Sequence, residues 1–138
     1  MTGVQTCALP IFRNSSQITF EYTGIYNIQF SLQLVNFANS PEDIDVWFRK
    51  NGTDLANSNT RFGLAARKSS SDPFHTVAAL NFIVSAIAGD YVQLMWCSTE
   101  AFSGASTGAY IEHYNASSSP TRPAIPSAIV TATFISQE

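Results

Sequence analysis

Charged side chains are scarce in this chain: of 138 residues, only 12% are Asp, Glu, Lys or Arg, about half the usual share of a soluble domain. The net charge of −3 leaves no basic surface, which argues against nucleic-acid binding. No apolar run reaches the length of a membrane-spanning helix, which argues against membrane insertion. The remaining polarity comes mainly from Ser, Thr, Asn and Gln, which favours close subunit packing or an extracellular setting.

The first eleven residues resemble a translated sequencing adapter. Back-translated, Met1-Thr2-Gly3-Val4-Gln5-Thr6-Cys7-Ala8-Leu9-Pro10-Ile11 resembles the index-adapter oligonucleotide of common short-read library kits, with GTG read as the start codon. We therefore expect residues 1–11 to carry no information about fold or function. Residues 12–138 then form a single domain whose native N-terminal residues are missing.

Cysteine is equally scarce, since Cys97 is the only one left once Cys7 is assigned to the adapter segment. A single cysteine excludes a disulfide framework, and we expect Cys97 to be a small apolar filler. His75 and His113 belong to no His-x-His, His-Glu-x-x-His or paired-cysteine pattern, so no zinc or iron site is predicted. The glycines match neither a phosphate-binding loop nor a dinucleotide fingerprint, so we expect no cofactor.

Acidic residues offer little catalytic chemistry. Asp72 and Asp90 stand in Asp-Pro and Gly-Asp pairs, which are typical of turns. Glu42, Asp43 and Asp45 form a small acidic cluster whose oxygens suit calcium, but the spacing is not that of a dedicated calcium loop, and a solvated loop is favoured. A carbohydrate-active enzyme would need two carboxylates facing each other across a cleft, which charge this sparse disfavours. We therefore predict that the protein is not an enzyme.

Strand signals dominate the chain. From Gly24 to Leu34, apolar residues alternate with polar ones, which is the period of a half-buried strand. Asn51-Gly52 is typical of a tight hairpin turn, and the return strand is expected over residues 54–62. Similar strand patterns occupy residues 44–49, 76–84, 91–96, 109–114 and 127–135.

Residues 116–126 contain three prolines and are expected to be irregular. The seven or eight strands, separated by turn clusters, predict an all-β fold: a two-sheet antiparallel β-sandwich of jelly-roll topology. The residues expected to contact one another between the sheets are Phe30, Phe48, Phe82, Leu94 and Phe134.

Three side chains alternate away from this core and are candidates for an outward apolar patch: Trp47, Tyr91 and Met95. Such a patch would serve as a binding surface or a subunit contact if the three residues cluster in the fold. If they are scattered, they need no functional explanation.

The order and spacing of three stretches resemble the globular head of the C1q/tumour-necrosis-factor family. Gln17-Ile18-Thr19-Phe20 followed by Thr23-Gly24-Ile25-Tyr26-Asn27-Ile28-Gln29-Phe30 is similar to the family's F…PGxYxFxY segment, with Thr23 in place of proline and Ile28 in place of phenylalanine. Ala88-Gly89-Asp90-Tyr91-Val92-Gln93-Leu94 is similar to its GDxVxL strand. Residues 127–135 stand where the family has its closing FxGFLL strand, without the glycine.

This resemblance implies a jelly-roll head that forms a homotrimer. The sheet that contains strand 24–34 would face the threefold axis, and binding surfaces would lie on loops such as residues 98–108 and 116–126. The implied trimer contact consists of neutral polar residues, which are cheaper to bury than charged ones: Asn27, Gln29, Ser31 and Gln33.

Two further stretches are similar to uncharacterised structural proteins of aquatic bacteriophages. They are Asp45-Val46-Trp47-Phe48-Arg49-Lys50-Asn51-Gly52-Thr53 and Ser119-Pro120-Thr121-Arg122-Pro123-Ala124. The expected function is therefore that of a non-enzymatic virion structural or attachment protein, with a host-surface glycan or protein as partner. The alternative is a secreted or surface-anchored C1q-like module that binds protein or glycan outside the cell.

Overall fold

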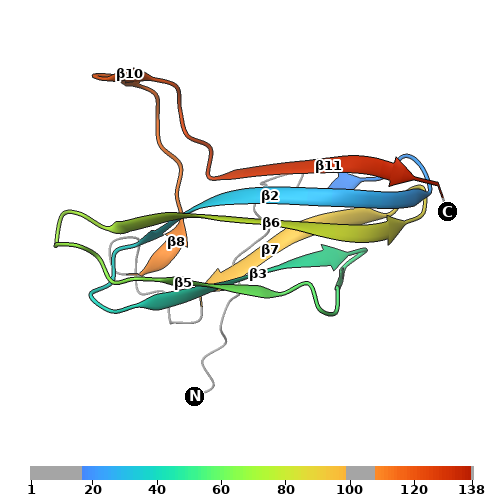
Figure 1. Ribbon diagram of the computed structural model, residues 1–138, viewed down its shortest axis with the longest axis horizontal. Helices are drawn as coiled ribbons and strands as arrows, with labels where there is room; N and C mark the ends of the chain where they lie inside the picture. Colours follow the sequence, from blue (N-terminus) through green and yellow to red (C-terminus); the bar gives the residue numbers. More distant parts are fainter. Residues whose placement is uncertain (1–16, 99–107, 138) are drawn as a thin grey trace.

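The described part of the chain folds into two antiparallel β-sheets that pack face to face (Figure 1). The structure, a computed structural model, describes residues 17–98 and 108–137. The predicted adapter segment, residues 1–11, lies outside the described residues, as does most of the predicted loop 98–108. Within the described ranges, no helix is long and apolar enough to cross a membrane.

We name the two sheets the β3 sheet and the β2 sheet after an inner strand of each. The β3 sheet contains β1 (Ile18–Thr19), β7 (Tyr91–Ser98), β3 (Glu42–Lys50), β4 (Thr53–Asp54) and β5 (Thr60–Leu64). The β2 sheet contains β11 (Ala128–Ser136), β2 (Gly24–Asn36), β6 (Phe74–Ala86) and β8 (Ala109–Ile111). In the second sheet, β2 pairs with β6 on one side and with β11 and β8 on the other.

The connections between strands cross repeatedly from one sheet to the other. The chain passes from β1 to β2, returns for β3, β4 and β5, crosses to β6, returns for β7 and ends in β11. Spatial neighbours are therefore distant in sequence: β2 lies beside β6 and β11, and β7 lies between β1 and β3. This is jelly-roll connectivity, and it confirms the predicted fold class.

Burial along β2 follows the predicted alternation, with Tyr26, Ile28, Phe30, Leu32 and Leu34 all buried. Aromatic rings join the two sheets: the centroid of Phe30 lies 5.9 Å from that of Phe48, which lies 5.4 Å from that of Phe82. Leu94 belongs to the same buried cluster. The predicted core is therefore confirmed for these four positions: Phe30, Phe48, Phe82 and Leu94.

The prediction that Phe134 lies between the sheets is wrong, because its side chain is 44% exposed. Its ring contacts that of Tyr26 edge-on, with 5.3 Å between centroids, and it covers Gly24, where an added Cβ would come within 2.6 Å of the ring. The pairing register of β11 shifts between Phe134 and Ser136. Phe134 keeps its regular register opposite Tyr26, but β11 pairs only with β2 among the described strands, so the ring is left partly uncovered at the rim of the core.

The turn after β3 has the predicted hairpin geometry, with positive φ at Asn51 (49°) and Gly52 (81°). The predicted continuous return strand is wrong, because residues 55–59 interrupt it between β4 and β5. The buried hydroxyl of Ser58 accepts a hydrogen bond from the Phe48 amide at 3.0 Å and donates one to the Leu55 carbonyl at 2.8 Å. The Ser58 hydroxyl thus takes the place of the backbone hydrogen-bond partner that a continuous return strand would have supplied to Phe48.

Residues 115–126 form a hairpin rather than the predicted irregular segment, and we call them the arm. Its two short strands, β9 (Ser117–Ser118) and β10 (Thr121–Arg122), pair antiparallel. At its base, Tyr114 and Ile125 exchange two backbone hydrogen bonds of 2.9 and 2.8 Å. Proline is tolerated here because the prolines occupy the turn and the flanks of the hairpin instead of its paired positions.

Candidate functional site

The outer face of the β2 sheet carries the predicted trimer-contact residues side by side. Asn27, Gln29 and Ser31 project from β2 between the outward residues of β6 and β11, and Gln33 lies opposite Val77 of β6. Gln29 lies between Asn81 and Thr131, and Ser31 lies between Ala79 and Ile129. We call the outward residues of β2, β6 and β11 the neutral face.

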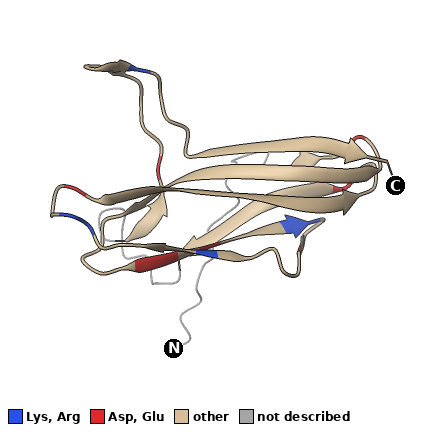
Figure 2. Ribbon diagram, viewed as in Figure 1, with Lys and Arg blue, Asp and Glu red and all other residues tan. Residues whose placement is uncertain are grey.

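No Asp, Glu, Lys or Arg occurs in β2, β6 or β11 (Figure 2). Large aliphatic side chains are instead exposed among the amides and hydroxyls of the neutral face. These are Val77 (54% exposed), Ile83 (51%), Ile129 (55%) and Ile135 (52%). Exposed apolar groups on a sheet without charge mark an interaction surface more than an isolated exposed residue does.

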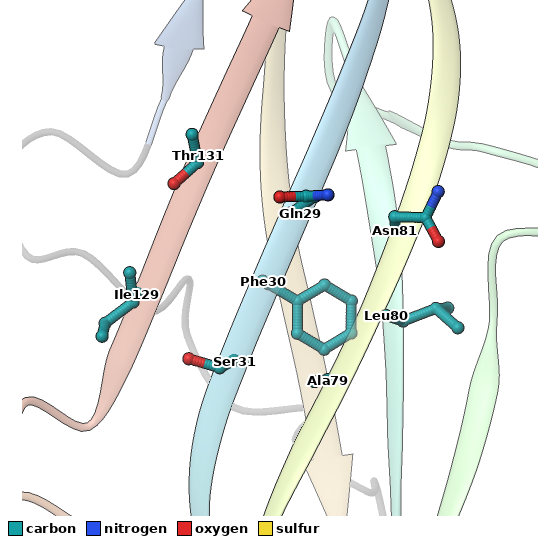
Figure 3. A pocket seen from close by; sticks show the side chains of 8 residues that line it. All are labelled: Gln29, Phe30, Ser31, Ala79, Leu80, Asn81, Ile129 and Thr131. Carbon is teal, nitrogen blue, oxygen red and sulfur yellow. The ribbon is translucent and has the colours of Figure 1, made fainter.

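Small side chains leave a hollow in the middle of the neutral face (Figure 3). Its volume is about 430 Å³, and its lining includes Ser31 and Ala79, which are direct cross-strand partners. Its lining offers amide, hydroxyl and aliphatic groups but no acid, base or charged ligand, so it suits hydrogen bonding and apolar contact. The lining residues are Gln29, Phe30, Ser31, Ala79, Leu80, Asn81, Ile129 and Thr131.

The outer face of the β3 sheet is charged and internally paired. Arg61 lies 2.8 Å from Asp45 and 3.9 Å from Asp43, and Arg49 lies 2.7 Å from Asp54. The hydrogen bond from Arg61 lowers the pKa of Asp45, and the bonds from Arg49 and then the Trp47 indole lower the pKa of Asp54. Both carboxylates are therefore held in their charged form.

The predicted acidic cluster of Glu42, Asp43 and Asp45 does not form a vacant cation site. The guanidinium of Arg61 lies against Asp43 and Asp45 and supplies the positive charge that a cation would bring. Within residues 17–98 and 108–137, no three His, Cys, Asp or Glu side chains are placed to hold a metal ion.

The predicted outward apolar patch is only partly formed. Trp47 and Met95 are direct cross-strand partners, and Trp47 and Tyr91 are half-buried. The prediction that Met95 is exposed is wrong, because only 5% of it is accessible. Met95 lies on β7 directly opposite the large Trp47 indole of β3, which covers one side of it. Trp47 itself donates a hydrogen bond of 2.9 Å to Asp54, which makes it part of the charged face.

A hydrogen-bonded group that sequence reasoning missed joins the base of the arm to β6. The Tyr114 hydroxyl donates to Glu112 Oε2 at 2.6 Å, and it lies 3.0 Å from His75 Nδ1. Because the hydroxyl hydrogen is directed at Glu112, Nδ1 of His75 is the donor to the Tyr114 oxygen. Burial and the Glu112 hydrogen bond raise the pKa of Tyr114. The fold, and not the local sequence pattern, brings His75 of β6 to Glu112 and Tyr114.

No family model matches the chain, and no curated protein sequence matches it. Among solved structures, it is similar to the globular domain of zebrafish complement 1qA protein. The identity is 11%, the match covers 97% of this chain and 92% of that chain, and the TM-score is 0.47. The strand order and pairing of the two sheets establish the jelly-roll fold.

Proposed function

We propose that this chain is a non-enzymatic binding head that assembles as a homotrimer through its neutral face. The observation that carries the proposal is the contrast between the two sheets: β2, β6 and β11 contain no charged residue, whereas β3 and β5 carry acidic and basic ones (Figure 2). Charged side chains are well hydrated on a surface that stays exposed to water. They are depleted from the core of a subunit contact, because burying them costs hydration energy. The β3 sheet would then face outward.

The polar groups of the neutral face are suited to burial. Uncharged amides and hydroxyls lose much less hydration energy than Lys or Glu and regain it by hydrogen bonding across the contact.

The edge strand β6 offers the second half of the contact. Among the described strands it pairs only with β2, over thirteen residues without a register shift. It lacks the charges, prolines and bulges that usually protect a long edge, and it exposes Val77, Leu80 and Ile83. Packing this edge on the face of a neighbouring subunit is a heterologous contact, which closes into a ring when three copies take part.

A lysine on the neutral face tests the trimer. Gln29→Lys would place three like charges in the buried contact, and we expect the dissociation constant to rise by about a hundredfold or more. Gln17→Lys, at an exposed position before β1, is the matched control. Light scattering of the parent at micromolar concentration decides the outcome, since a clean monomer would refute the trimer.

We further propose that the head is a virion structural or attachment protein whose outward surfaces bind a host glycan or protein. This role is motivated by the expected resemblance of two stretches to phage structural proteins. One stretch runs along β3 into its turn, and the other lies in the arm. The alternative is a secreted or surface-anchored C1q-like module. Neighbouring genes separate the two roles: terminase, portal and tail genes favour the virion protein, and a signal peptide with a collagen-like stalk favours the module.

A further inference from the structure

The arm, residues 115–126, stands clear of the sandwich. In Figure 1 it rises past β11, away from β3 and β5. Most of its residues are exposed, and only Ser117, Arg122 and Ile125 are half-buried. We propose that the arm of one subunit packs on a neighbouring copy of the same chain and locks the assembly; this inference rests on the proposed trimer.

The arm is held rigid at its base. Two backbone hydrogen bonds join Tyr114 to Ile125, and the Tyr114 hydroxyl connects Glu112 with His75 of β6. Tyr114 is therefore a positioning residue that fixes the direction in which the arm leaves the β2 sheet. A contact element that is already ordered loses little conformational entropy on binding.

The arm is also ordered along its length. The Arg122 guanidinium donates to the Asn115 carbonyl at 3.3 Å, and the Thr121 hydroxyl donates to the Ser118 carbonyl at 3.3 Å. A lone two-stranded hairpin is marginally stable in water at best, so a projecting hairpin gains stability from a surface to pack on.

Charge and position identify a second copy as the partner. Arg122 is the only charged residue in residues 115–126, and its guanidinium is bonded within the arm. The rest is Ser, Thr, Asn, Ala, Ile and Pro, which matches the uncharged neutral face and not the ion-paired β3 sheet. The arm leaves between β8 and β11, both of which pair with β2, so it is continuous with the proposed contact.

A charge on the arm tests this contact. Ser118 is exposed and its side chain lies far along the hairpin from Tyr114, so Ser118→Glu leaves the sandwich intact. We expect it to raise the trimer dissociation constant about tenfold or more, because a carboxylate would be buried against a neutral surface. Ser70→Glu, in the exposed loop between β5 and β6, adds the same charge elsewhere and should leave that constant unchanged.

A second variant separates positioning from direct contact. Tyr114→Phe removes the hydroxyl that joins His75 to Glu112, and we expect a weaker trimer while the melting temperature of the dilute monomer stays close to that of the parent. A trimer whose dissociation constant is unchanged by Ser118→Glu overturns the proposal. If Gln29→Lys still dissociates that trimer, the proposed function stands and the arm is not part of the contact. A monomeric parent overturns both the proposed trimer and the proposed role of the arm. If Ser118→Glu abolishes host-surface binding but leaves the trimer intact, the arm contacts the ligand instead.

Discussion

The carboxylate of Asp90 shows how single residues hold this sandwich together. It accepts hydrogen bonds from Lys50 at 2.8 Å, from Asn51 at 2.7 Å and from the Ile87 amide at 3.0 Å. Lys50 also donates to the Ser85 carbonyl of β6 at 2.8 Å. Asp90 is therefore the turn-forming residue that the Gly-Asp pair predicts, and through Lys50 it also ties the β3 sheet to the β2 sheet.

These interactions, with the Lys50 bond foremost, lower the pKa of Asp90 from 3.8 to about 2. A carboxyl whose pKa is lower in the folded state stabilises the fold above the unfolded pKa and loses that contribution as the pH falls through the folded pKa. We therefore expect Asp90→Asn to lower the melting temperature at pH 7, and this difference from the parent should shrink between pH 3.8 and about 2. Thermal melts across this range measure it; a difference independent of pH would contradict the account.

Ser58 is a second residue that stabilises the sandwich through its side chain, which here takes the place of a backbone hydrogen-bond partner of Phe48. Ser58→Ala would leave the buried Phe48 amide without its acceptor, at a cost of about 1–3 kcal/mol in the free energy of unfolding. The exposed Ser70→Ala should change that free energy by less than about 0.5 kcal/mol. Denaturant unfolding compares the two variants, and equal effects would mean that water satisfies the amide.

At the scale of elements, strands with regular alternation could be predicted and interruptions could not. The run from Gly24 to Leu34 predicts β2 to within two residues, because one face is buried along its whole length. The break at residues 55–59 depends on Ser58 reaching Phe48, a contact that periodicity does not encode. The arm was missed for a similar reason, since its pairing is specified by local hydrogen bonds and not by burial.

The aromatic contacts between the sheets allow a direct test of the core. Phe48 is 1% exposed and touches both Phe30 and Phe82, so Phe48→Ala should lower the free energy of unfolding by about 3–5 kcal/mol. Phe134→Ala removes the same ring from the rim of the core and should cost clearly less. Urea titration provides both values, and an equal loss would show that Phe134 belongs to the core after all.

At the scale of the whole molecule, the candidate site could be predicted in part. Alternation alone placed Asn27, Gln29, Ser31 and Gln33 on one outward face. The hollow and the row of exposed aliphatics depend on which strands flank β2, and a single sequence does not specify strand order. Met95 shows the same limit, since its neighbour Trp47 on β3 is set by the strand order.

The absence of charge on the neutral face also has a kinetic consequence. Nothing on that face attracts a second copy over a distance, so the proposed subunits should associate at about 10⁵–10⁶ M⁻¹ s⁻¹, the rate of partners without electrostatic steering. Raising the ionic strength from about 0.05 to 0.5 M should leave this rate unchanged, and rapid-dilution scattering at the two salt concentrations would reveal any dependence. The ion-paired β3 sheet keeps its sensitivity to salt. Salt would then change the affinity for a charged ligand without changing the number of subunits in the assembly that binds it.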